Sequence, residues 1–105
     1  LESSFKIAKE KYPNATFHIF ADDYSELKNI KLPAKSYINY ESDIFNKINQ
    51  MSLFNNFIIM NSSFAWWPIY FSNLKSNSIV IMPKIWYKKY KKNCHPMHEF
   101  ATHLV

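Results

Sequence analysis

The fold is decided by the stretch Phe57-Ile58-Ile59-Met60-Asn61-Ser62-Ser63-Phe64-Ala65-Trp66-Trp67. It opens with an apolar run over 57–60 that is too short for a buried helix, which predicts a central strand. A helical pattern resumes over 64–74, so the polar segment 61–63 stands where a strand passes into a helix. The stretch therefore predicts a strand–turn–helix unit, the building block of an α/β fold.

Further strands and helices alternate on both sides of this unit. Helical spacing of apolar residues and runs of β-branched and aromatic residues predict helices over 1–12, 25–30 and 41–55 and strands over 16–20, 35–40 and 78–82. Such alternation favours a parallel sheet with flanking helices, in which ligands gather at the carboxyl ends of the strands. Asp22-Asp23 and Ser62-Ser63 both follow such ends. No period is visible over 86–105, and no structure is predicted there.

Length and composition narrow the class of protein. A chain of 105 residues with 48% hydrophobic residues suits one compact domain, and we expect residues 1–105 to form a single, partial domain of a longer protein. The absence of glycine excludes a Walker loop and a G-x-G-x-x-G fingerprint. No apolar run approaches the roughly 20 residues that cross a bilayer. We expect a cytoplasmic location, with association at a membrane surface as an alternative.

The net charge of +5 favours an anionic partner. The lysines over 84–92 are interpreted as a solvated charged face, ahead of a nucleic-acid patch, and no nucleic acid is expected as a partner. Cys94, His95, His98 and His103 match no common zinc framework, because their spacing is poor and Pro96 interrupts them. No metal is therefore expected.

Ser62 and Ser63 are the strongest candidates for ligand binding from the residues alone. At the start of a helix, their hydroxyls and the unpaired backbone N–H groups would meet at one spot and bind phosphate. The alternative is that Asn61, Ser62 or Ser63 caps its own helix. For Asp22-Asp23 a capping or turn role stands beside a binding role. Trp66 and Trp67 leave the helix about 100° apart, so one of them would pack on the sheet and the other would face a ligand or another domain.

Three segments resemble the α-1,2-fucosyltransferase family. Asn61-Ser62-Ser63-Phe64-Ala65-Trp66-Trp67 is similar to the last of its three short motifs, usually Asn-Ser-Ser-Phe-Ser-Trp-Trp in bacterial members. Phe17-His18-Ile19-Phe20-Ala21-Asp22-Asp23 resembles the second motif, and Ile79 to Trp86 resembles the strand, proline and tryptophan that follow. The segments occur in the order of the family.

The resemblance implies the C-terminal half of a GT-B glycosyltransferase, a Rossmann-like domain that holds the donor GDP-fucose. The reaction implied is metal-independent transfer, with inversion, to the 2-hydroxyl of a terminal galactose in a glycan acceptor. The serines would contact the diphosphate with Phe64 beside them, and the aspartates would face the nucleoside, since carboxylates repel a diphosphate. The implied donor-binding residues are Asp22, Asp23, Asn61, Ser62, Ser63 and Phe64.

The chain also departs from the family pattern. The first motif, His-x-Arg-x-x-Asp, is missing, and the chain contains no arginine. We expect this motif, the acceptor site and the catalytic base to belong to an N-terminal domain outside the fragment. Lys47 stands where the wider superfamily often has an acidic residue that pairs with guanine. Lysine cannot accept those hydrogen bonds, so guanine selectivity would depend on Asp43, one helical turn earlier, as a substitute. Pro68 would kink its helix unless it lies in the first turn. A truncated, non-catalytic nucleotide-binding or interaction domain is the alternative.

Overall fold

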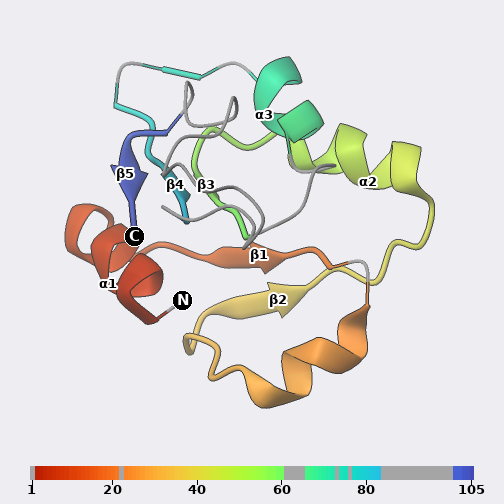
Figure 1. Ribbon diagram of the computed structural model, residues 1–105, viewed down its shortest axis with the longest axis horizontal. Coiled ribbons are helices and arrows are strands. Elements are labelled where there is room, and N and C mark those ends of the chain that lie inside the picture. The colour runs from red at the N-terminus through yellow and green to blue at the C-terminus, as the bar shows by residue number, and fades with distance from the viewer. Residues whose placement is uncertain (1, 22, 61–65, 73, 76, 84–100) are drawn as a thin grey trace, which may run out of the picture. The chain divides into compact units, whose positions relative to one another are not determined.

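The computed structural model describes the whole chain except residues 1, 22, 61–65, 73, 76 and 84–100. Its elements appear in Figure 1. In chain order they are α1 (Glu2–Lys11), β1 (Phe17–Ile19), the 3-10 helix η1 (Tyr24–Asn29), β2 (Ser36–Ile38), α2 (Ile44–Met51), β3 (Phe57–Ile58), α3 (Trp66–Phe71), β4 (Val80–Met82) and β5 (His103–Leu104). The chain divides into two compact units, 1–47 and 48–105, and the division falls inside α2. It is a small α/β fold with parallel strands and helices.

The first unit is built on the parallel pair β1–β2. Phe17 lies opposite Ser36 and Ile19 opposite Ile38. α1 buries Ala8, while Lys6 and Lys9 stay in solvent, so the helix is amphipathic as its spacing predicts. The Phe5 ring meets the Phe17 ring edge to face, with 5.2 Å between centroids. This aromatic contact joins α1 to β1 inside the unit.

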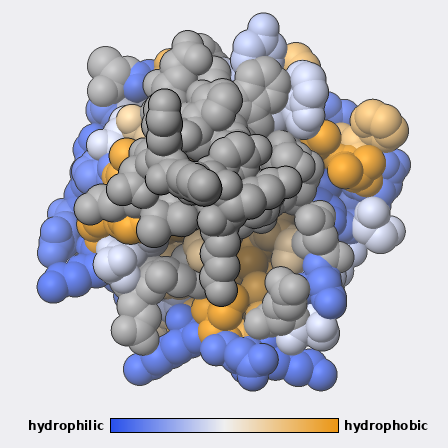
Figure 2. Space-filling view, in the orientation of Figure 1, coloured by the Kyte–Doolittle hydropathy of each residue, from blue (hydrophilic) through white to orange (hydrophobic). Residues whose placement is uncertain are grey.

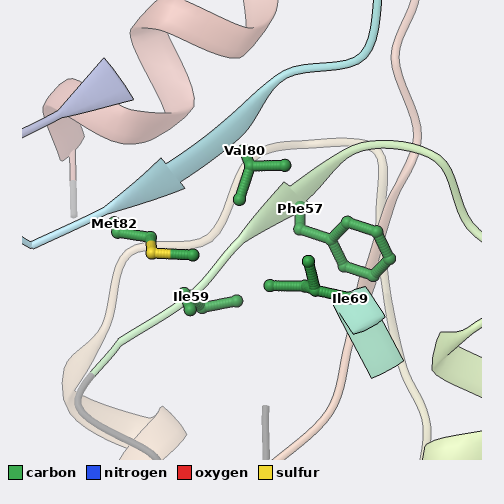
Figure 3. Close-up of a cluster of buried hydrophobic side chains, with 5 residues drawn as sticks. All are labelled: Phe57, Ile59, Ile69, Val80 and Met82. Carbon is green, nitrogen blue, oxygen red and sulfur yellow. The ribbon is translucent and has the colours of Figure 1, made fainter. Parts of the chain in front are cut away.

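The second unit is a parallel sheet in the order β3-β4-β5. β4 is buried on both faces: Val80 and Met82 project from one face, while Ile81, between them, is fully buried as well. On the first face they meet Phe57, Ile59 and, from α3, Ile69 (Figure 3). On this face, the cluster therefore packs between the sheet and one short helix.

Three structural predictions can be compared with these elements. The helices and strands expected between residues 1 and 82 are confirmed as elements, most of them shorter, and all observed pairs are parallel. The central position expected for the strand over 57–60 is wrong among the described strands, because β4 pairs on both sides and β3 on one. The strands also form two sheets. β5 was not expected, since a pair of residues offers no period to detect.

Pro68 causes no interruption of α3. It is the third residue of the helix, within the first turn, where a backbone N–H has no intrahelical acceptor to lose. Its ring is among the most deeply buried side chains. The fixed φ of proline therefore suits this position, and its ring adds to the packing of the second unit.

Candidate functional site

The segment after β1 carries the first predicted site residues. Asp23 is the N-cap of η1, and its Oδ1 accepts hydrogen bonds from the Ser25 hydroxyl at 2.7 Å and the Ser25 backbone N–H at 3.0 Å. The bond from the hydroxyl, followed by the bond from the backbone, lowers the pKa of the Asp23 carboxyl. Asp23 is thus an exposed, ionised carboxylate whose side chain orders the start of η1. The capping role foreseen for this pair is confirmed at Asp23.

Lys47 reaches the same segment from α2. Its side chain is buried, with 5% of its surface exposed, and its Nζ donates a hydrogen bond to the Ala21 carbonyl at 2.8 Å. The same nitrogen lies 5.7 Å from the centroid of the Tyr24 ring, a cation–π distance. A buried ammonium is costly unless such partners replace its water. The lysine therefore bonds to the backbone on one side of Asp23 and to a ring on the other.

Tyr24 connects the start of η1 to the residues that precede α2. Its hydroxyl donates to the Glu41 carbonyl at 3.2 Å, and its ring lies 5.0 Å from the ring of Tyr40. The residues before α2 are ordered in turn, since the Asn39 side chain accepts from the Glu41 N–H at 2.8 Å. The segment that ends β1 and the segment that enters α2 are thus bonded to each other through side chains.

The start of α2 fixes the position of Lys47 along the helix. The Asp43 Oδ1 accepts from the Phe45 N–H at 2.9 Å, and the Asp43 carbonyl accepts the Lys47 N–H, also at 2.9 Å. Asp43 is therefore the cap that its sequence position predicts. Its carboxylate has a structural role, and a contact of Asp43 with guanine stays a prediction.

Comparison with known proteins assigns the chain to a family. The profile of glycosyl transferase family 11 matches residues 1–99. The chain belongs to glycosyl transferase family 11. No curated protein and no solved structure matches it. The family resemblance carried by 17–23 and 61–67 is confirmed, and at the level of the family the chemistry is that of a glycosyltransferase.

The other donor-binding residues expected from this family fall outside the described part of the chain. Asp22, Asn61, Ser62, Ser63 and Phe64 are outside the described residues, so of the predicted site only Asp23 is placed. The sequence singles out Lys47 only as a departure from the acid of the wider superfamily, and nothing in it singles out Tyr24. No local sequence pattern predicts the contacts of Lys47 and Tyr24. The partner of Lys47, Ala21, is 26 positions away, and the partner of Tyr24, Glu41, is 17 positions away.

Three aromatic side chains of α3 reach the surface, and one of them, Trp67, belongs to the family motif. Trp67 is 46% exposed and stacks on Phe71 with 6.0 Å between centroids, and Tyr70 meets Phe71 edge to face. Figure 2 shows hydrophobic residues, in orange, at the surface among hydrophilic ones. Trp67 therefore faces outward, and the side chain of Trp66 is outside the described set.

The lysine- and histidine-rich segment of this family member is mostly outside the described residues, including Lys84 to Lys92, Cys94, His95 and His98. His103 is described, and its Nδ1 lies 2.9 Å from the Thr102 hydroxyl. Within the described part of the chain, no group of three His, Cys, Asp or Glu side chains could hold a metal ion. None of the helices found there is long and apolar enough to cross a membrane.

Proposed function

We propose that this chain is the donor-binding part of an α-1,2-fucosyltransferase. It holds GDP-fucose in the Rossmann-like, C-terminal half of a GT-B fold, for metal-independent transfer with inversion to the 2-hydroxyl of a terminal galactose. The observation that carries the proposal is the family 11 match over residues 1–99, which includes both the Asp22-Asp23 segment and the segment 61–64. Both segments follow strands, β1 and β3.

The side-chain chemistry of the two segments supports different contacts: the serine segment with the diphosphate and the aspartate segment with the nucleoside. Hydroxyl groups donate to phosphate oxygens, so Ser62 and Ser63 are assigned to the diphosphate, with Asn61 and Phe64 beside them. Carboxylates accept from hydroxyl, ring N–H and amino groups, which a nucleoside offers. Asp23 accepts two hydrogen bonds from Ser25, which supports an ordering role for it and leaves Asp22 for the nucleoside.

Calorimetric titration of the 105-residue chain with GDP, GMP and UDP tests this proposal. We expect the order GDP, then GMP, then UDP in decreasing affinity. Loss of the β-phosphate removes contacts with the serines, and loss of guanine removes contacts with the aspartate segment. Equal binding of the three nucleotides, or binding of none, would contradict the proposal. Titration with magnesium present and absent checks metal independence, for which the GDP affinity is expected to stay the same.

A second candidate is a nucleotide-binding or interaction domain that does not catalyse transfer. It is favoured by one feature of the sequence: all 13 cationic side chains are lysines, so no bidentate arginine grips the leaving diphosphate. The two candidates agree on nucleotide binding and differ in transfer. We expect GDP-fucose and a galactoside to release no GDP above background with this chain alone, and steady GDP release when a domain carrying the His-x-Arg-x-x-Asp motif is added. Absence of release in the second case would favour the non-catalytic candidate.

A further inference from the structure

The carbonyl of Ala21 lies beyond the reach of the β1–β2 ladder. Past the paired residues of β1 and β2, the Asn39 N–H donates to the Ile19 carbonyl at 2.9 Å. The chain then leaves the sheet through Ala21 and enters η1 at Tyr24. Among the described residues, no backbone N–H of the sheet donates to the Ala21 carbonyl, and the Lys47 ammonium bonds to it instead.

Lys47 is suited to hold this segment and unsuited to touch a phosphate. With 5% of its surface exposed, its ammonium already donates to Ala21 at 2.8 Å and lies against the Tyr24 ring. A direct phosphate contact would require the ammonium to leave its buried position. The contacts favour an indirect action, through the Ala21 backbone on one side of Asp22-Asp23 and the Tyr24 ring on the other.

We propose that Lys47 is a positioning residue of the nucleotide site: it fixes Ala21 and Tyr24, the residues on either side of Asp22-Asp23, so that base recognition finds these flanking residues already ordered. The inference rests on the proposed function, because it assumes that the segment faces the nucleoside. A segment ordered before binding loses less conformational freedom when the ligand arrives. Lys47 therefore contributes to selectivity among bases without touching one.

The substitution Lys47→Met tests this role, since methionine keeps an unbranched chain and removes the ammonium. We expect the affinity for GDP to fall about tenfold, because the residues that Lys47 holds must then be ordered when GDP binds, and ordering about one backbone residue has an effect of this size. Binding of UDP, which does not use the guanine contacts, is expected to be unchanged, so the selectivity for GDP over UDP falls by the same factor. The conservative variant Lys47→Arg keeps a donor to the Ala21 carbonyl and is expected to restore most of the selectivity.

Lys6→Met is the matched control. Lys6 is an exposed lysine of α1, so this variant removes the same charge from a helix without altering a buried contact. We expect its affinities for GDP and UDP to equal those of the original chain. If Lys6→Met lowers GDP binding as much as Lys47→Met does, a general charge effect is responsible and the positioning role is overturned.

The outcomes separate the inference from the proposed function. If the original chain binds no nucleotide, the proposed function fails. If the original chain and Lys47→Met show the same selectivity for GDP over UDP, only the positioning role fails. A parallel loss of GDP and UDP binding in Lys47→Met also overturns the role, because a merely structural lysine would act on both.

Should Lys47→Met not fold, Tyr24→Leu provides the second variant, because it removes the ring against Nζ and the hydroxyl bond to Glu41. We expect reduced selectivity for GDP over UDP, and unchanged selectivity in a folded Tyr24→Leu overturns the inference.

Discussion

The ammonium of Lys47 donates a hydrogen bond to the backbone carbonyl of Ala21, over 2.8 Å and across 26 positions of sequence. It joins α2 to the end of β1 within the first compact unit. Position 47 has a lysine where the wider fucosyltransferase superfamily often has an acidic residue. The structure gives the lysine a role of its own there, as a donor to backbone that the sheet does not hold.

The acid–base behaviour of Asp23 depends on Ser25. The pKa of the Asp23 carboxyl lies below the ordinary value of 3.8, first because the Ser25 hydroxyl donates to it and then because the Ser25 N–H does. We expect Ser25→Ala to raise this pKa toward 3.8, as measured by NMR titration of the side-chain carboxyl carbon. Ser3→Ala, an exposed serine of α1, is the control and should leave the titration unchanged.

The sign of the stability effect follows from that pKa. Because the folded pKa is lowered, the ionised cap stabilises the fold above the unfolded value of 3.8, and this contribution disappears as the pH falls through the folded pKa. Between pH 3.8 and the folded pKa of Asp23, the free energy of unfolding should therefore decline less in Asp23→Ala than in the original chain. An identical acid decline in both, measured by urea denaturation, would contradict the role of the cap.

Ile69 connects α3 to the core of the second unit, where 1% of its surface is exposed. Shortening it leaves a cavity, so we expect the free energy of unfolding to fall by about 1 kcal/mol in Ile69→Val and by about 2–5 kcal/mol in Ile69→Ala. Urea denaturation measures both. The control is Leu53→Ala: Leu53 is 82% exposed, and a change within about 0.5 kcal/mol is expected there.

Thr102 attaches the beginning of β5 to β4. Its hydroxyl accepts from the buried Val80 N–H at 2.8 Å, and its own backbone N–H donates to the Val80 carbonyl at 2.8 Å. Thr102→Val keeps the shape but leaves the Val80 N–H without that acceptor, at a cost of about 1–3 kcal/mol. Amide exchange should accelerate at Val80, while the Ile59 N–H, bonded to the Ile81 carbonyl, reports on general unfolding. Thr16→Val, at an exposed position, should leave the exchange of Val80 as it was.

The serines of the family motif provide a test of the proposed diphosphate contact. We expect the double substitution Ser62→Ala and Ser63→Ala to weaken GDP binding at least tenfold, because lost hydrogen bonds to a charged group are worth about 1.5–3 kcal/mol each. Guanosine has no phosphate, so its affinity should not change. A similar loss for guanosine and GDP would indicate damage to the domain instead, and Ser42→Ala, at an exposed position, serves as the control.

The sequence by itself determined which local elements form and to which family the chain belongs. Helical spacing over 1–12 and the apolar run over 78–82 predict α1 and β4, and the prolines at 13 and 83 follow their ends, because periodicity and proline act over a few neighbouring residues. The motif at 61–67 pointed to glycosyl transferase family 11 for the same reason: its residues are adjacent.

Only the tertiary structure decided which strand is central, where β5 pairs, and what Lys47 does. β4 became central because β5 joins its second edge, a pairing between residues such as Ile81 and His103 that no local period encodes. Lys47 became a donor to Ala21 because folding brings two distant segments together and leaves the ammonium buried, where it requires a partner. Non-local contacts of this kind are fixed by packing, and neither residue type nor spacing specifies them.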